Sequence, residues 1–246
     1  MNEYIRHITP MVLAAGLGTR LGKFTESCPK ALVKVGSNTL LEIILNKLRI
    51  AGFNSVIINV HHFADQIISY LKANNNFGMT ILISDESDKL MDTGGALLMA
   101  LPLIPSNNQL LVHNVDVISS IDLNLFIRTH LTRKACATLA VRDRKSSRKL
   151  VFGNDLTLEG WINTSTQERL QVKETITPNA KLLAFNGIHL VDPGCLRSYK
   201  VYPRPVINMY LELAKTQKVI GFFDHSDTWY DLGKAEQLIE FEKKIK

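Results

Sequence analysis

The sequence predicts an α/β protein, in which a mainly parallel mixed sheet is flanked by helices and is followed by a small antiparallel part. Two observations lead to this prediction. Up to residue 141, strand-like segments alternate with segments whose apolar residues recur at helical spacing, which is typical of a parallel sheet with right-handed crossovers. After Lys149 the alternation stops and short strand-like segments follow one another, which indicates antiparallel pairing.

The alternating part is expected to begin with a buried strand, because ITPMVLAA at residues 8–15 is almost wholly apolar. A first helix is expected at residues 38–52, since its apolar periodicity begins after Ser37 and Asn38 and stops at Gly52. The strands expected after it span residues 55–60, 79–84, 108–115 and 135–141, and the helices between them span residues 63–74, 93–101 and 121–131.

The second part is expected to form an antiparallel insertion or extension that covers one edge of the sheet. Its expected strands span residues 149–153, 155–163 and 181–191. A helix near residues 206–216, a strand at residues 219–223 and a final helix at residues 234–246 follow. Since no linker, internal repeat or low-complexity segment interrupts the chain, residues 1–246 are expected to form a single domain.

The composition favours a globular protein that binds small anionic ligands. The 246 residues are 46% hydrophobic, and the formal net charge is +6. Lys and Arg are scattered and no aromatic-rich RNA-binding signature occurs, so no nucleic-acid partner is predicted. The densest basic run, RDRKSSRK at residues 142–149, is interpreted as a solvated loop, with a patch facing a ligand or a partner as the alternative.

The sequence favours a cytoplasmic protein. The opening residues MNEYIRHITP are polar, and no apolar run approaches the length of a membrane span, so neither a signal peptide nor a membrane segment is predicted. The three cysteines, Cys28, Cys136 and Cys195, lack CxxC spacing and indicate neither a disulfide framework nor a zinc site. The oligomeric state stays open between a monomer and a homo-oligomer.

The glycine-rich loop at residues 16–22 follows the first expected strand. Its spacing does not match the dinucleotide fingerprint GxGxxG, and it lacks the GK[ST] ending of a P-loop. Glycines let backbone N–H groups approach phosphates, and Arg20 and Lys30 add two cations beside the loop, which fits a triphosphate that is to be bent and cleaved. The alternative is a glycine-rich turn with a surface arginine.

Two aspartates are candidate metal ligands. Asp116 follows the strand-like LLVHNV and therefore points to the edge of the sheet where the glycine-rich loop lies. Asp231 lies in an expected turn just before the last helix. Two carboxylates together with substrate phosphates make a common Mg²⁺ site. The alternatives are a polar cap on a strand end for Asp116 and a helix-start residue for Asp231.

The motifs resemble those of the sugar-1-phosphate nucleotidyltransferases, also called nucleotide-sugar pyrophosphorylases. LAAGLGTRL followed by PKALVKVG is similar to their signature, and the similarity extends along nearly the whole chain. DTGGAL resembles their base-recognition turn, HNVD their metal-binding segment, FNGIHLV their sugar-binding strand and WYDLGKAEQL their closing motif. The resemblance implies a Rossmann-like nucleotidyltransferase fold with a small antiparallel sugar-binding part. It also implies a stand-alone catalytic domain, because relatives with a second β-helix domain are much longer.

The resemblance assigns a role to each matching position. Arg20 would activate the phosphates of the incoming triphosphate, and Lys30 would contact the phosphoryl group under attack. Asp116 and Asp231 would hold Mg²⁺. The residues expected to line the nucleotide are Ala14, Ala15, Gly16 and Gly18, and those expected to face its purine or pyrimidine base are Gly94 and Gly95. Asn186 and Gly187 are expected to contact the sugar.

The chain departs from the family pattern at the sugar-phosphate segment. The usual Glu-Lys-Pro before the sugar strand is absent, and Val172-Lys173-Glu174 stands at about the right distance, so Lys173 is expected to keep the sugar-phosphate contact. Trp161, in GWINTSTQE, is interpreted either as a surface that stacks on a sugar ring or as a core anchor.

The reaction implied is the attack of a sugar-1-phosphate oxygen on the α-phosphorus of a nucleoside triphosphate, with release of pyrophosphate (an EC 2.7.7-type transfer). UTP is favoured, as in the N-acetylmuramate-1-phosphate uridylyltransferases. The alternative is a GTP-dependent mannose- or heptose-1-phosphate guanylyltransferase, because a bare glycine turn does not specify the base.

Three other classes of protein would require different features in the sequence. A Rossmann oxidoreductase would need an acidic residue at the end of the second strand, which instead ends in Asn59-Val60-His61. An inactive nucleotide-sugar binding protein would have lost one of the four charged site residues, and all four are present. A cytidylyltransferase of the choline-phosphate kind would need an aromatic or charged cage, for which Trp161 and Trp229 are the candidates.

Overall fold

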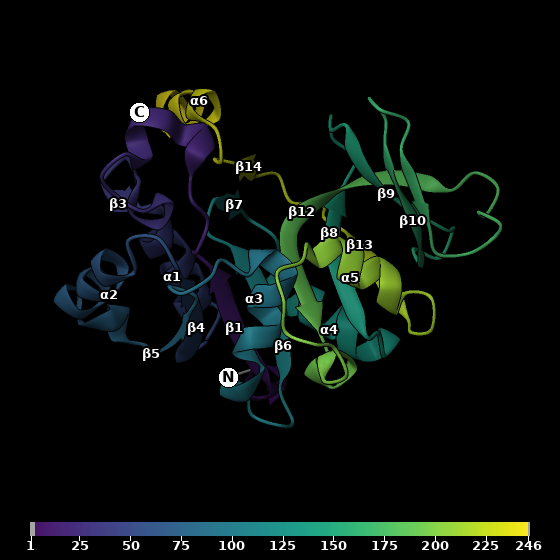
Figure 1. Ribbon diagram of the computed structural model, residues 1–246, viewed down its shortest axis with the longest axis horizontal. Helices are drawn as coiled ribbons and strands as arrows, with labels where there is room; N and C mark the ends of the chain where they lie inside the picture. The colour runs from purple at the N-terminus through teal and green to yellow at the C-terminus, as the bar shows by residue number, and fades with distance from the viewer. Residues whose placement is uncertain (1–2, 246) are drawn as a thin grey trace.

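The computed structural model describes residues 3–245 and has a ten-stranded mixed sheet as its centre (Figure 1). The strand order along the main path is β11-β10-β9-β12-β6-β1-β4-β5, with β8 paired to β12 and β13 paired to β8. The strands of this sheet are β1 (Ile8–Leu13), β4 (Ser55–Val60), β5 (Thr80–Asp85), β6 (Gln109–Asn114), β8 (Ala137–Arg142), β9 (Arg148–Phe152), β10 (Leu158–Asn163), β11 (Arg169–Gln171), β12 (Lys181–Val191) and β13 (Val219–Phe223). Within residues 3–245 no helix has both the length and the apolar character needed to cross a bilayer.

The parallel half of the sheet matches the alternation in the sequence. Strands β6, β1, β4 and β5 pair in parallel, and the helices that connect or cover the strands are α1 (Leu40–Ile50), α2 (Ala64–Ala73), α3 (Asp92–Ala100), α4 (Leu123–Arg133), α5 (Val206–Leu213) and α6 (Ala235–Ile245). Helix α1 begins two residues later than expected, because Thr39 caps it: its side chain accepts from the Glu42 N–H while the Glu42 carboxylate accepts from the Thr39 N–H.

Helices cover both faces of the sheet, as predicted. Neighbouring residues of β1 point to opposite sides, so Met11 belongs to the apolar cluster beneath α3 and α5, and Val12 to the cluster beneath α1, α2, α4 and α6. Figure 1 shows α3 and α5 together on the face toward the viewer. Burial on both faces explains why the central strands are apolar throughout rather than alternating.

The antiparallel pairing was predicted correctly, but the position of this part in the sheet was predicted only in part. Strand β12 does not cover an edge; it enters the body of the sheet, where its second half lies between β6 and β8, and its first three residues pair with β9. Strands β9, β10 and β11 then extend the sheet from β12. The register between β12 and β8 shifts between Phe185 and His189, and this bulge of β12 contains Asn186 and Gly187.

Five short strands were not predicted. One is β11, which ends the large sheet. The other four form two separate pairs, β2 (Lys34–Val35) with β3 (Asn38–Thr39) and β7 (Val117–Ser119) with β14 (Trp229–Asp231). Strands of two or three residues carry no periodic pattern, so they depend on tertiary pairing alone. The β7–β14 pair joins residues far apart in the sequence and brings the last part of the chain back to the centre of the molecule.

Burial of His130 makes the stability of the fold depend on pH. Its Nδ1 lies 2.8 Å from Thr138 Oγ1 and its Nε2 lies 3.0 Å from Gln109 Oε1, and burial lowers the pKa of the imidazole to about 4. The unfolded chain binds this proton with the ordinary pKa of about 6.5. The stabilisation is therefore complete above about pH 6.5 and is lost as the pH falls toward the folded value.

We expect His130→Gln to flatten this loss of stability. Between about pH 6 and pH 4, the free energy of unfolding should depend on pH less steeply than in the wild type, by up to about 1.4 kcal/mol per pH unit. Urea denaturation at several pH values measures the difference. His7→Gln is the control, since His7 is exposed. Equal pH profiles for both variants would contradict the assignment.

Candidate active site

The loop after β1 is held by Thr25 and by its own backbone. Gly18 has a φ of 69°, and a Cβ at this position would lie 2.7 Å from Thr25 Cγ2, so a larger residue would be strained. The Thr25 hydroxyl donates to the Gly18 carbonyl at 3.0 Å, and Leu21 is buried beneath the loop. Gly16 is exposed with open space beside it. Gly16 therefore offers its backbone to a ligand, whereas Gly18 serves the shape of the loop.

Asn59, at the carboxyl end of β4, connects three strand ends. Its Oδ1 accepts from the N–H groups of Ala14 at 2.6 Å and Ala15 at 3.4 Å, and its Nδ2 donates to Glu86 Oε1 at 2.8 Å. Glu86 Oε2 accepts from the Met91 N–H at 3.0 Å. Asn59 and Glu86 are 3% and 2% exposed. This network ties the ends of β1, β4 and β5 to the start of α3 and fixes the backbone around Ala15.

Lys30 and Asp116 form a buried ion pair between Nζ and Oδ2, and each side chain is 11% exposed. Lys30 opens the short 3-10 turn Lys30–Leu32, and Asp116 lies in the turn between β6 and β7. Removing either partner would leave an uncompensated buried charge, which is strongly destabilising. The pair therefore joins the segment after the glycine-rich loop to the centre of the sheet.

Asp231 lies beside Asp116, although it is not in the plain turn expected before the last helix. It ends β14 and pairs in register with Val117 of β7, next to Asp116 in the sequence. The Leu232 N–H donates to the Asp116 carbonyl at 2.8 Å. The pairing of β14 with β7 is therefore what brings the two carboxylates together.

Gly233 marks the point where the charged groups converge. A Cβ at this position would lie 2.8 Å from Asp116 Oδ2, 2.9 Å from Asp231 Oδ1 and 3.0 Å from Arg20 Nη2. A side chain at residue 233 would occupy the space between the three groups. Glycine is needed here because it leaves that space to the charged groups and their ligands.

The two carboxylates suit a hard divalent cation. Within residues 3–245 there is no group of three or more His, Cys, Asp or Glu side chains that could hold a metal ion. An ion at Asp116 and Asp231 would thus take its remaining ligands from phosphate oxygens and water, which is the habit of Mg²⁺.

Three cavities share lining residues around this point, and Arg20 lines all of them. The first cavity, of about 370 Å³, is lined by residues including Ala15, Gly16, Lys30, Asn59, Glu86, Thr93 and Asp116. The central cavity, of about 130 Å³, is lined by residues including Asp116, Arg144, Asn186, Gly187, Trp229 and Asp231. The outer cavity, of about 610 Å³, is lined by residues including Arg144, Lys145, Arg148, Trp161, Phe185, Asp231 and Lys234.

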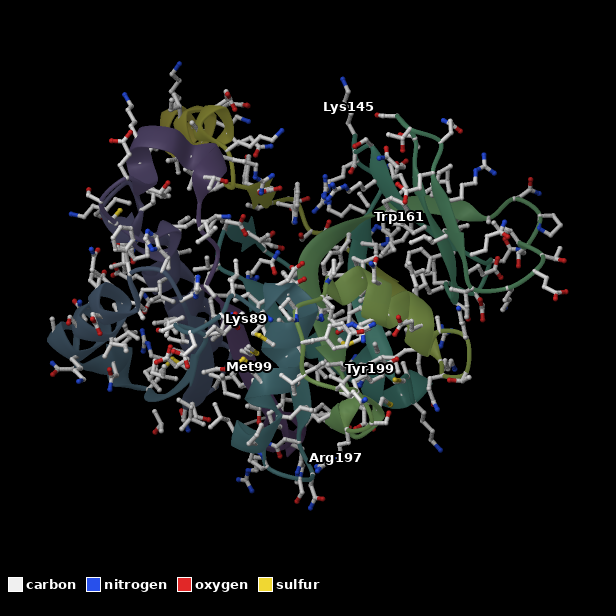
Figure 2. The ribbon with its side chains drawn as sticks, viewed as in Figure 1. Lys89, Met99, Lys145, Trp161, Arg197 and Tyr199 are labelled. Carbon is white, nitrogen blue, oxygen red and sulfur yellow. The ribbon has the colours of Figure 1, made fainter. Side chains whose placement is uncertain are left out.

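The basic run at residues 142–149 is not simply a solvated loop. Residues 144–148 line the outer cavity, so the alternative interpretation, a patch facing a ligand, fits the structure. Trp161 lines the same cavity and also packs against the apolar core beneath α5, so both of its expected roles agree with its position. Figure 2 shows Trp161 on the antiparallel part and Lys145 above it, at the upper edge of the molecule.

Asn186 and Gly187 lie at the bulge of β12 and line the central cavity, and their expected contact with the sugar stays a prediction. Gly187 has a φ of 79°, and a Cβ there would lie 3.0 Å from Asn114 Nδ2. Asn186 is buried and donates from Nδ2 to Asp224 Oδ2 at 2.8 Å, while its Oδ1 has no hydrogen-bond partner within the described part of the chain.

Lys173 does not reach this site. Its Nζ lies 3.5 Å from Glu159 Oε1, its side chain is 54% exposed, and it lines none of the three cavities. The buried Glu159 also accepts from the Thr177 N–H and hydroxyl. The expected sugar-phosphate contact of Lys173 is therefore not supported, because the ion pair with Glu159 holds it on the antiparallel part.

Gly94 and Gly95 are also placed differently from expectation. They lie inside α3 and line none of the three cavities. A Cβ on Gly94 would lie 2.9 Å from the Arg204 carbonyl oxygen, and one on Gly95 would lie 2.7 Å from the Tyr202 carbonyl oxygen. These glycines are required by the packing of the chain before α5, whereas Asp92 and Thr93 at the start of α3 line the first cavity.

A neutral histidine lies beneath the centre of the site. His113 is buried, and its Nδ1 lies 2.8 Å from the Asn114 carbonyl oxygen, to which it donates. Burial, together with the smaller effect of the Lys47 charge, lowers the pKa of His113 to about 3. Lys47 donates from Nζ to the Ser119 carbonyl at 2.5 Å, and burial lowers its pKa to about 8. The turn around Asp116 is thus supported from below by groups that bond its backbone.

Asn59, Glu86 and Arg144 were missed as site residues. The position of Asn59 at the end of a strand beside β1 was a usable signal, because ligands bind outside the carboxyl ends of parallel strands. Glu86 directly follows the next strand in the same way. Arg144 lies in the basic run at residues 142–149, but nothing in that run distinguishes it from the other cations beside it.

We expect Asn59→Ala to destabilise the protein by roughly 2–4 kcal/mol, because it leaves the Ala14 N–H and the Glu86 carboxylate without their buried partner. Urea denaturation measures the change. Asn54→Ala is the matched control, since Asn54 is exposed just before the other end of β4. Equal losses in the two variants would refute the role given to the Asn59 network.

Comparison with known proteins agrees with this geometry. The family model for "Nucleotidyl transferase" matches residues 9–154. The chain is 41% identical over 243 residues to the N-acetylmuramate alpha-1-phosphate uridylyltransferase of Caulobacter vibrioides, covering 96% of each chain. The fold is shared with HddC of Yersinia pseudotuberculosis, complexed with GMP-PN, at a TM-score of 0.78 and 19% identity, covering 97% of this chain and 100% of the other.

A UDP-glucose pyrophosphorylase complexed with UDP-glucose also has the same fold, with a TM-score of 0.74 at 18% identity, over 97% of this chain and 98% of the other. The fold is therefore the Rossmann-like fold of these enzymes. The family model covers more than half of the chain, and the relative from Caulobacter vibrioides matches nearly all of it. This chain belongs to the nucleotidyl transferase family and is a sugar-1-phosphate nucleotidyltransferase.

Proposed function

We propose that the protein transfers a uridylyl group from UTP to N-acetylmuramate 1-phosphate. An oxygen of the acceptor phosphate attacks the α-phosphorus of UTP, a new phosphorus–oxygen bond forms, and the bond to the β-phosphate breaks. Pyrophosphate leaves with the bonding electron pair. The convergence of Arg20, Asp116 and Asp231 on one point, with Lys30 paired to Asp116, carries the proposal for the chemistry.

The protein's share of this reaction is positioning and charge neutralisation, which is how phosphoryl-type transfers are catalysed. The exposed backbone at Gly16 offers N–H groups to the triphosphate. Arg20 can hold two phosphate oxygens at once and stabilise the departing pyrophosphate. Lys30 exchanges its bond to Asp116 for one to the α-phosphate, where negative charge builds up in the transition state.

Asp116 and Asp231 are proposed to hold Mg²⁺. When bound, the ion neutralises the phosphate oxygens and lowers the cost of bringing the two anionic substrates together. This assignment also explains why Gly233 leaves the space between the carboxylates free.

The charge of the outer cavity and the relative from Caulobacter vibrioides both support this choice of acceptor. The outer cavity is lined by Arg20, Arg144, Lys145, Arg148 and Lys234, with Asp231 as its acidic member. This excess of cations suits a sugar that carries a carboxylate as well as a phosphate. The relative from Caulobacter vibrioides, whose name includes N-acetylmuramate and uridylyl transfer, favours the same acceptor and UTP.

A substrate panel tests the proposal. Pyrophosphate release with Mg²⁺ would be measured for UTP, GTP, CTP and dTTP against N-acetylmuramate 1-phosphate, mannose 1-phosphate and phosphocholine. We expect UTP with N-acetylmuramate 1-phosphate to give the highest kcat/KM, and a chelator to abolish release because the metal is lost. Release with GTP and mannose 1-phosphate, or with CTP and phosphocholine, would instead place the protein in the corresponding branch.

We expect Asp231→Asn to lower kcat by a factor on the order of 10²–10³, because the metal loses one of its two carboxylates. Asp231 is a cleaner test than Asp116, whose removal would also leave the buried Lys30 unpaired. Asp227→Asn is the matched control, since Asp227 is exposed just before β14. A fully active, folded Asp231→Asn protein would rule out this metal site.

A further inference from the structure

Arg144 is the cation that joins the outer cavity to the central one. It lines both, together with Arg20, Phe185 and Asp231. It does not line the first cavity, where Gly16 and Lys30 lie. Arg144 therefore borders the cavities beside Trp161 and Asn186 and not the cavity beside Gly16.

Two contacts hold the Arg144 guanidinium in place. Its Nη2 donates to the Phe185 carbonyl at 2.8 Å, and its Cζ lies 4.2 Å from the centre of the Trp229 ring. The Trp229 Nε1 in turn donates to the Asn186 carbonyl at 3.1 Å. The guanidinium and the ring are thus both anchored to the backbone at the bulge of β12.

The protein provides partners for only some of the hydrogen-bond donors of this guanidinium. An arginine side chain has five N–H donors, and Arg144 Nε is buried with no hydrogen-bond partner in residues 3–245. Burial lowers the pKa of Arg144 and Arg142 adds to this, whereas the negative charge of Asp231 opposes it. A charged, partly buried group with donors to spare is suited to an anion that binds next to Asp231.

Other cations on this side are less suited to that task. Lys145, Arg148 and Lys234 line the outer cavity but are exposed, so solvent and salt screen their charges. Lys173 is paired with Glu159 away from the cavities. Arg144 is the lining cation whose orientation is set before a ligand arrives, and preorganised donors lose less on binding.

We propose that Arg144 binds the phosphate of the sugar 1-phosphate and presents its oxygen to the α-phosphorus, in place of the lysine that the family places before the sugar strand. This inference rests on the proposed function. It also sets the orientation of the acceptor in the outer cavity: with its phosphate at Arg144, the sugar extends toward Trp161 and the exposed cations. It also explains why Lys173 is free to pair with Glu159.

Steady-state kinetics of pyrophosphate release tests the assignment, with each substrate varied in turn. We expect Arg144→Gln to raise KM for the sugar 1-phosphate by at least about tenfold, since a charge-assisted phosphate contact is lost, and to leave KM for UTP within about threefold. The KM of Arg144→Lys for the sugar 1-phosphate should lie between those of the wild type and Arg144→Gln, because lysine keeps the charge but not the bidentate contact. Arg197→Gln is the matched control, because Arg197 is an exposed arginine that lines none of the three cavities, and it should change KM by less than about twofold.

A merely structural role would give a different result. If Arg144 only supported Trp229 and β14, Trp229→Ala would raise KM as much as Arg144→Gln, and the thermal midpoints of both variants would fall. An unchanged KM for the sugar 1-phosphate, or a rise in KM for UTP as large as that for the sugar 1-phosphate, would overturn the proposal. The second result would mean that Arg144 holds the triphosphate instead.

Calorimetric binding of the sugar 1-phosphate and of the unphosphorylated sugar to wild type and Arg144→Gln separates this inference from the proposed function. Loss of the preference for the phosphorylated sugar in the variant supports the proposal. If another nucleotide and sugar pair is the active one, the same variants are compared with that pair. A wild-type protein that binds no sugar 1-phosphate and releases no pyrophosphate would overturn both proposals.

Discussion

The Asn59 side chain is the constraint on which the geometry of the site depends. Three parallel strands end side by side at this edge of the sheet, and their last backbone groups have no further strand partner there. The Asn59 side chain accepts from the N–H of Ala14, just after β1. Glu86, which follows β5, accepts from the Asn59 side-chain amide and from the Met91 N–H at the start of α3. Because both side chains are buried, the network is maintained by the cost of leaving any member unpaired. The open backbone at Gly16 follows directly from Ala14 and Ala15, so its position is fixed by the same bonds.

Charge is concentrated where the two ends of the chain meet. Lys30, near the beginning, pairs with Asp116 at the centre of the sheet, and Asp231, near the end, is brought to the same place by β14. Negative carboxylates at this density are tolerated because Lys30 and Arg20 lie among them. In the proposed mechanism, the cation beside Asp116 changes when substrates arrive, from the Lys30 ammonium to Mg²⁺. Under that proposal, folding assembles the site and the anionic ligands complete it.

Strand β12 links the two halves of the molecule. Its second half is a central strand of the sheet, and its first residues begin the antiparallel part. The bulge between them contains Asn186, and its backbone carbonyls accept hydrogen bonds from Trp229 and Arg144. A change in the register of β12 would therefore alter the central cavity, the stacking of Arg144 and the position of β14 together. This coupling is a physical reason for the bulge to occur where it does.

The sequence by itself determined the fold class, most helices and strands, and the four charged residues that the structure brings together beside the glycine-rich loop. Arg20, Lys30, Asp116 and Asp231 could be named because they stand in motifs at strand ends and beside a glycine-rich loop. Periodicity and motif spacing are local, so they carry this information. The roles of Gly94, Gly95, Lys173 and Arg144 were decided only by the tertiary structure. Gly94 and Gly95 face the backbone before α5, Lys173 pairs with Glu159, and Arg144 is held by Phe185 and Trp229. Each of these depends on a partner distant in the sequence, and the pattern of a single chain predicts where a strand or helix lies but not which distant segment it contacts.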